Sequence, residues 1–356
     1  MLVAPAAVHA DELAVYDDIH EHDAVDVHAL LDAYIQHSFG TGSLQFRAFD
    51  TTTDAPALGL LRLTLAHRPG TFGFRIDAGL GDTADGYLHS DPEATDHHDL
   101  ARGLSFVQQA FVTAVVPVGT GIAVDVGKLG TFVGLEENDT LANWHYSRSL
   151  LYTLPEPTYH TGLRATYAPS AAVTTQLLWV NGWNTNLLDG NRMRSVGGAV
   201  SWRPNDDLEL VADYLGGLER APTRLADSTL AWRHVVDTYV TYRATADISL
   251  AASVDLGHDA RAGGASWWGV AGYGRVRVVD WLFAIARAEL LSDPDEFLTG
   301  TSQRLIAVTG TVEARRVIRG VTTVGRLEWR HDHSDTLAFA GSRAQDTASL
   351  SLVLAF

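Results

Sequence analysis

The last twelve residues, 345–356, alternate between apolar and polar side chains and end on an aromatic residue. One side of an extended strand would carry Ala348, Leu350, Leu352, Leu354 and Phe356, and the other would carry Thr347, Ser349 and Ser351. In water such an apolar face needs a second sheet, whereas in a bilayer it can meet lipid while the polar face lines a lumen. The same alternation recurs along most of the chain. We therefore predict an all-β fold, a transmembrane antiparallel β-barrel.

Composition agrees with this prediction and excludes other classes. The chain is 46% hydrophobic, but it has no run of 18 apolar residues, so no segment predicts a membrane-spanning helix. The formal net charge of −17 argues against a nucleic-acid partner. The absence of cysteine excludes disulfides and thiol chemistry.

Segments of about ten residues, the length of a tilted membrane-spanning strand, carry this pattern along the chain. We place sixteen of them, at 27–38, 56–68, 72–81, 104–117, 120–129, 159–168, 172–183, 194–203, 207–219, 231–245, 247–258, 265–278, 281–292, 304–316, 319–332 and 345–356. Short turns such as 69–71, 117–119 and 168–170 alternate with long connections such as 39–55, 82–103 and 130–158. This alternation is typical of outer-membrane barrels, which have short periplasmic turns and long external loops. An even number of strands then places both termini in the periplasm.

Tryptophans fall near the ends of the predicted strands, as expected for aromatic belts at the two membrane interfaces. Those near periplasmic ends are Trp202 and Trp281, and those near external ends are Trp183, Trp268 and Trp329.

The first 26 residues stand apart from this pattern. Residues 1–10 end in Val8-His9-Ala10, which is typical of a signal-peptidase site, so we interpret them as the remnant of a signal peptide. Residues 11–26 form an acidic N-terminal segment, and 27–356 form a single barrel domain.

Several segments resemble the OmpL-like β-barrel porin family of Gram-negative outer membranes. The resemblance is carried by 72–81, by 109–112 with 126–129, by 143–149 with 160–167, by 180–183, and by Arg326-Leu327-Glu328-Trp329-Arg330. It covers nearly the whole chain after residue 26, although Leu129 stands where an aromatic residue would be expected. It implies a sixteen-stranded porin, and the strand count read from turn spacing agrees. Phe356 resembles the C-terminal assembly signal of this class, which implies the barrel-assembly machinery and outer-membrane lipids as partners.

The longest connection, 130–158, corresponds to the third external loop, which in sixteen-stranded porins folds into the lumen. We expect it to narrow the pore. Its candidate constriction residues are Glu136, Glu137, Asp139 and Arg148. A loop packed on top of the barrel is the alternative interpretation.

Charged residues at inward positions should line the lumen. The predicted pore-lining residues are Arg62, Arg75, Asp77, Asp125, Arg164, Arg243, Arg275, Arg287, Glu289, Glu313, Glu328 and Arg330. Further acidic residues at inward positions of the predicted strands include Asp213 and Asp237. Separate basic and acidic walls would create a transverse field, whereas interleaved charges would form structural salt bridges. Lys128, the only lysine, has outward parity unless a bulge near Gly127 turns it inward.

We therefore predict a porin for passive diffusion of small hydrophilic solutes and ions. A substrate-specific channel for sugars or anions is the alternative, and an outer-membrane barrel enzyme is a weaker one. We expect no cofactor and no catalytic group, because passive diffusion needs neither. We also expect no metal site, because His20 and His22, and His97 and His98, lie in a tail or an external loop with no fixed geometry. Acids in 82–100 and 130–158 favour a weak cation preference. Because porins often form trimers, the sequence leaves a homotrimer open.

Overall fold

The computed structural model describes residues 25–40, 42–67, 70–90, 106–185, 193–220, 229–261 and 263–356, without the side chains of residues 88 and 89. These residues form sixteen strands, as predicted: β1 (Asp26–Ser38), β2 (Pro56–His67), β3 (Phe72–Leu80), β4 (Val107–Val116), β5 (Ile122–Gly130), β6 (Tyr159–Ser170), β7 (Val173–Val180), β8 (Ser195–Asn205), β9 (Leu208–Arg220), β10 (Leu230–Arg243), β11 (Ile248–Asp259), β12 (Ala265–Val279), β13 (Leu282–Asp293), β14 (Gln303–Ile318), β15 (Val321–Ser334) and β16 (Ala344–Ala355). Residues 1–10 and most of 11–26 lie outside the described residues.

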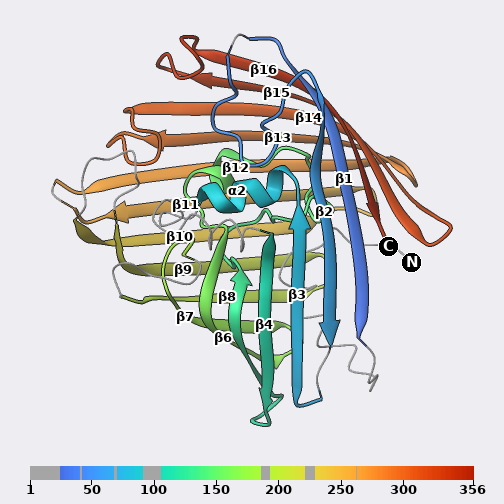
Figure 1. The fold of residues 1–356 in the computed structure, drawn as a ribbon, viewed down its shortest axis with the longest axis vertical. Coiled ribbons are helices and arrows are strands. Elements are labelled where there is room, and N and C mark those ends of the chain that lie inside the picture. Colours follow the sequence, from blue (N-terminus) through green and yellow to red (C-terminus); the bar gives the residue numbers. More distant parts are fainter. Residues whose placement is uncertain are drawn as a thin grey trace.

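Every strand pairs with its sequence neighbours, and β1 pairs antiparallel with β16 to close the barrel (Figure 1). At this seam the Phe356 N–H donates to the Ala29 carbonyl at 2.9 Å. Closure leaves no sheet edge with unpaired backbone groups, which a strand in lipid could not tolerate. The prediction of a closed all-β barrel is thus confirmed.

Short turns and long connections alternate around the barrel and place the start of β1 and the end of β16 at the short-turn end. One predicted turn is displaced, because residues 168–170 belong to β6, whose pairing with β7 shifts register between Tyr167 and Ser170. Two long connections contain helices that we did not predict, α2 (Asp82–Ser90) and α4 (Leu150–Thr153). Acids in the first turn favour α2, and the Ser149 side chain caps α4 by accepting from the Tyr152 N–H. Among the described helices, none is long and apolar enough to span a membrane.

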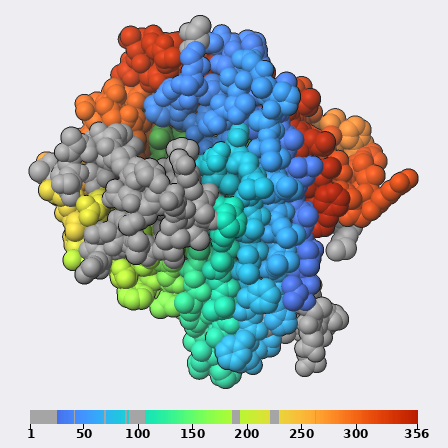
Figure 2. Space-filling view, viewed as in Figure 1, coloured from blue at the N-terminus to red at the C-terminus, as the bar shows by residue number. Residues whose placement is uncertain are grey.

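The two faces of the wall are opposite in polarity to those of a water-soluble sheet sandwich. In β13, Ala286 and Ala288 are exposed on the outside, while Arg287 and Glu289, which alternate with them, are buried inside. The outer surface of β1 to β4 faces the viewer in Figure 2. Most exposed side chains of these strands are apolar, including Leu31, Ile35, Leu61, Leu63, Ile76 and Val112. Side chains that face lipid are mostly apolar, and many of those that face the interior are charged or polar, as expected for a membrane barrel.

The aromatic residues only partly follow the predicted belts. Trp202, Trp268, Trp281 and Trp329 are exposed on the outer surface. The prediction for Trp183 was wrong, because β7 ends at Val180 and Trp183 packs against the buried cluster around Phe132. Its ring also lies 5.4 Å from the inward guanidinium of Arg233.

Lys128 is buried, contrary to the outward parity that simple alternation gives it. Its Nζ lies 4.2 Å from the ring centroid of Tyr159 and 5.3 Å from that of Tyr87 in α2. The paired residues Gly127 and Gly162 both have positive φ, at 144° and 157°, without a register shift in this pairing. These conformations, which glycine adopts readily, change the side-chain direction beyond Gly127.

Candidate functional site

Residues 131–158, which join β5 to β6 and are here termed the inserted loop, contact the inner face of the barrel on several sides. Towards β1 and β2, Thr140 donates to Asp32 at 2.7 Å, and Arg62 pairs with Asp139 at 2.5 Å. Towards β15, the Tyr146 and Ser147 N–H groups donate to the Glu328 carboxylate at 2.7 and 3.0 Å. β2, β1, β16 and β15 are consecutive in the closed barrel, so these contacts attach the loop to an arc of the inner face away from β5 and β6, the strands that it joins.

Three arginines of the β13–β15 wall hold the backbone of the inserted loop. Arg287 donates to the Ser147 carbonyl at 2.9 Å, and Arg330 donates to the Arg148 carbonyl at 2.5 Å. Arg326 donates to the Thr140 and Asn143 carbonyls at 2.9 and 2.6 Å. Charge-assisted hydrogen bonds are stronger than neutral ones, so this wall fixes the loop along residues 140–148.

Glu136 joins this network through its side chain. It accepts from Arg287 at 2.8 Å and from the Ser149 N–H at 2.6 Å. Burial alone would raise the pKa of the Glu136 carboxyl, but Arg287 and the Ser149 N–H outweigh burial and hold the pKa below its usual value. Glu136 is thus an ionised structural contact between loop and wall.

The other candidate constriction residues have different surroundings. Arg148 is buried and donates to the carbonyls of Glu137, Asn138 and Tyr146 at 2.7, 2.9 and 2.8 Å, so it crosslinks the inserted loop itself. Glu137 is half-buried and receives the Asn143 side chain on its backbone carbonyl at 2.7 Å. Of the four, Glu136 and Asp139 form ion pairs with the barrel wall, with Arg287 and Arg62 respectively.

Predicted pore-lining charges are mostly interleaved as salt bridges. The pairs are Arg75–Asp77 at 3.0 Å, Arg164–Asp125 at 3.0 Å, Arg275–Glu313 at 2.7 Å, Arg287–Glu289 at 2.8 Å and Arg330–Asp332 at 2.8 Å. Of the two arrangements that the sequence left open, this geometry favours structural salt bridges over separate basic and acidic walls. Arg243, also predicted to line the pore, instead lies at the short-turn end of the barrel. It is half-exposed and pairs with Asp207 at 2.6 Å.

Apolar packing adds to these polar contacts. Phe132 and Val133 at the start of the inserted loop join a buried cluster with Leu178, Val180 and Leu215 of the wall. On the other side, Leu151 packs with Ala271 and Tyr273. The inserted loop is thus held by a hydrophobic contact near each end and by arginines between them.

The sequence matches the family described as "Putative beta-barrel porin-2, OmpL-like" over residues 24–356. The chain belongs to this family. The search for similar sequences among curated proteins found no match. As members of a β-barrel porin family, these proteins are channels of the Gram-negative outer membrane, in accord with the closed barrel and its apolar outer surface.

Solved structures of outer-membrane channels share the fold of this family member at low sequence identity. The barrel is similar to trimeric OmpT of Vibrio cholerae, with a TM-score of 0.61 and 12% identity, covering 94% of this chain and 98% of that one. It is also similar to the outer-membrane channel DcaP of Acinetobacter baumannii, with a TM-score of 0.62, 9% identity and coverage of 93% and 97%. The barrel is also similar to an anion-selective porin from Comamonas acidovorans, with a TM-score of 0.57 and 10% identity, covering 94% of this chain and 99% of that one.

Two inner-face residues were missed by the sequence analysis of this porin-family chain. Arg47, in the connection between β1 and β2, pairs with Asp332 at 3.0 Å and donates to Thr347 at 2.9 Å, and no local pattern marked it. Asp255 lies on the inner face of β11, directly opposite Asp237 of β10. Asp255 is two residues after Ser253 and therefore shares its inward face, so period-two alternation could have predicted that Asp255 points inward.

Proposed function

We propose that the protein is a passive diffusion channel for small hydrophilic solutes and ions, and that the inserted loop narrows its lumen. The observation that carries this proposal is the reversed polarity of the wall, apolar outside and charged inside. A channel of this kind needs a rigid wall and a narrowing that limits the size and charge of the solutes that pass. It needs no catalytic group. Membership of a porin family supports a channel over a barrel enzyme.

The orientation in the membrane follows from the two kinds of connection. We propose that the short turns and both termini are periplasmic and that the long connections are external, as in other outer-membrane barrels. Phe356, exposed on the outer surface at the seam with β1, would serve as the assembly signal for the barrel-assembly machinery. A homotrimer is part of the proposal because structurally similar OmpT is described in a trimer form.

A weak cation preference is proposed on a different basis from the sequence prediction. Glu136 and Asp139 are paired with arginines, so their charge is largely compensated. Acids on the inner faces of β9–β11, by contrast, lie close to one another. They would attract cations over roughly a Debye length, about 8 Å at physiological salt. Of the acids expected in 82–100, Asp91, Glu93, Asp96 and Asp99 lie outside the described residues.

Liposome swelling tests this proposal directly. Vesicles that contain the refolded barrel should swell in small sugars at a rate that falls steeply with solute size. Vesicles without protein, and vesicles with heat-unfolded protein, serve as controls. Swelling no faster than in these controls, with a folded barrel present, would refute a diffusion channel. Rapid swelling with one sugar only would favour the substrate-specific alternative.

A further inference from the structure

Three aspartates form a row across the inner face of the barrel. Asp213 of β9 is the register partner of Asp237 of β10, which in turn is the register partner of Asp255 of β11. Their side chains are buried, with exposures of 4%, 0% and 0%. Like charges placed directly opposite each other on adjacent strands destabilise a sheet, so this row requires a compensating interaction.

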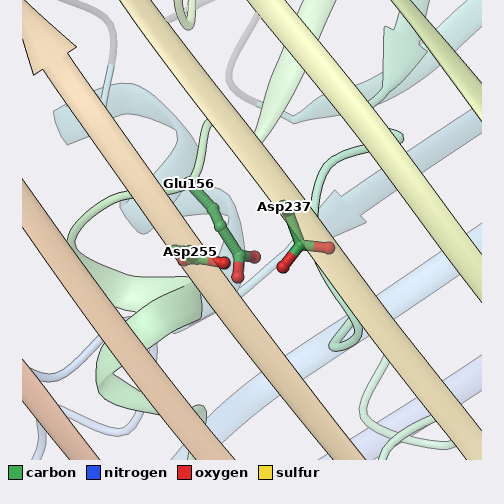
Figure 3. Close-up of side chains that lie close together, drawn as sticks. All are labelled: Glu156, Asp237 and Asp255. Atoms are coloured by element: carbon green, nitrogen blue, oxygen red, sulfur yellow. The ribbon is translucent and has the colours of Figure 1, made fainter.

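A fourth carboxylate reaches the row from the inserted loop. Glu156, at the end of that loop, is 5% exposed, and its carboxyl group is directed toward Asp237 and Asp255 (Figure 3). Each of these three side chains contributes one oxygen to a set whose members all lie within 4.8 Å of one another. The distance suits several oxygens that share one cation.

The backbone of the inserted loop leaves room for this carboxylate. Gly134 has a φ of +95°, and a Cβ built there would lie 2.0 Å from Oε2 of Glu156. The conformation favours glycine, and any side chain here would displace the Glu156 carboxylate. The start and the end of the inserted loop thus meet at the acidic row.

Hydrogen bonds do not satisfy all of these carboxylates. Ser253 donates to Asp237 at 2.9 Å, and the Gly134 and Asp237 N–H groups interact with the Asp213 carboxyl. Among the described residues, the polar neighbours of the Asp255 carboxyl are the carboxyls of Asp237 and Glu156, so no donor from a neutral or basic group satisfies it. The Tyr239 hydroxyl gives a separate observation, since it is 3% exposed and lacks a hydrogen-bond partner in the described part of the chain. It lies on the same inner face of β10 and interacts electrostatically with Glu209, and then with Asp213 and Asp237. A neutral oxygen is therefore left without a partner beside the acids.

Two kinds of counterpart can compensate buried carboxylates, namely protons and a cation. Shared protons would neutralise some of the acids, as occurs where two carboxyls are close. A Ca²⁺ ion instead takes six to eight oxygen ligands, including bidentate carboxylates and waters, and suits a site made only of oxygens. Zinc and copper favour nitrogen and sulfur donors, which this set does not offer.

We propose that Glu156, Asp237 and Asp255, with Asp213 beside them, bind one hard divalent cation of the Ca²⁺ type. The cation fastens the inserted loop to the β9–β11 wall, on the side where the β13–β15 arginines do not reach. The inserted loop is then held to the barrel at β9–β11 as well as at β13–β15. This site does not depend on whether solutes pass through the barrel.

The test uses the full chain refolded from inclusion bodies, which avoids cations bound to lipopolysaccharide. After treatment with EDTA and dialysis at pH 8, Ca²⁺ is titrated by calorimetry, and thermal unfolding is followed with and without Ca²⁺. Mg²⁺ alone serves as a second probe. We expect one Ca²⁺ per barrel, a higher unfolding temperature with Ca²⁺, and weaker binding of Mg²⁺.

Variants make the assignment specific. Asp255→Asn should weaken Ca²⁺ binding at least tenfold and abolish the thermal shift, and Glu156→Gln should act in the same direction. Asp280→Asn, an exposed turn position, is the matched control and should behave as wild type. In EDTA the Asp255→Asn barrel should be at least as stable as wild type, because a repulsive charge is removed. No saturable Ca²⁺ binding to wild type, or unchanged binding to Asp255→Asn, would overturn the proposal and leave shared protons as the counterpart.

Discussion

Replacing Arg287 by methionine should release the inserted loop from the β13–β15 wall. Arg287 bonds Glu136, Glu289 and the Ser147 carbonyl at 2.8, 2.8 and 2.9 Å, and its side chain is buried. The substitution keeps most of the apolar stem but leaves two buried carboxylates without their cation. Loss of one partner of a buried pair costs about 3–5 kcal/mol. At about 1.4 kcal/mol per factor of ten, this shifts the ratio of docked to released loop by roughly 10²- to 4 × 10³-fold.

Limited proteolysis of folded barrels measures loop release. A protease that cleaves after aromatic residues should cut the variant within the inserted loop, at Trp144 or Tyr146, much faster than wild type. Arg277→Met is the matched control, because Arg277 pairs with Asp247 at 2.7 Å at the short-turn end, far from the loop in the fold. If the Arg287 and Arg277 variants are cleaved equally slowly, the arginine does not hold the loop and our interpretation of these contacts is wrong.

Three further predictions concern other positions. Phe356→Asp places a charge at the lipid-facing seam and should cost roughly 1–3 kcal/mol, lowering the yield of heat-modifiable folded barrel, whereas unchanged yield would contradict the assembly role. Burial holds the pKa of His145 below its usual value, so the stability that it contributes is present above about pH 6.5 and is lost as the pH falls toward its lowered folded value. The unfolding temperature of wild type should therefore fall more on acidification than that of His145→Gln. Gly134→Ala should lower the unfolding temperature, since the added methyl meets the Glu156 carboxylate; an unshifted transition would argue against that close approach.

The sequence predicted the barrel well because its determinants are local. Period-two alternation and the spacing of turns depend on neighbouring residues, and all sixteen predicted segments correspond to strands with ends that differ by a few residues. The exceptions also have local physical reasons. Paired glycines at 127 and 162 redirect Lys128, and capping at Ser149 creates a short helix where a loop was expected.

Contacts inside the barrel could be predicted much less well. Arg287 and Glu136 are 151 residues apart, and their pairing depends on how the inserted loop crosses the interior. Asp213, Asp237 and Asp255 form a row only because the register of β9, β10 and β11 aligns them. Parity shows that a side chain points inward, but it does not give the residue's height in the barrel or its partner. The loop acids were therefore predicted to set selectivity, whereas in the structure Glu136 is paired.

Single-channel recording in a planar bilayer tests the central claim most directly, namely that this barrel is an open channel narrowed by the inserted loop. The refolded wild type should insert in discrete, nearly ohmic conductance steps, with a reversal potential of weak cation sign in a salt gradient. The Arg287→Met barrel should give larger steps, and Arg277→Met should match wild type. Insertion without conductance steps, from protein whose circular dichroism shows a folded β-barrel, would contradict the claim.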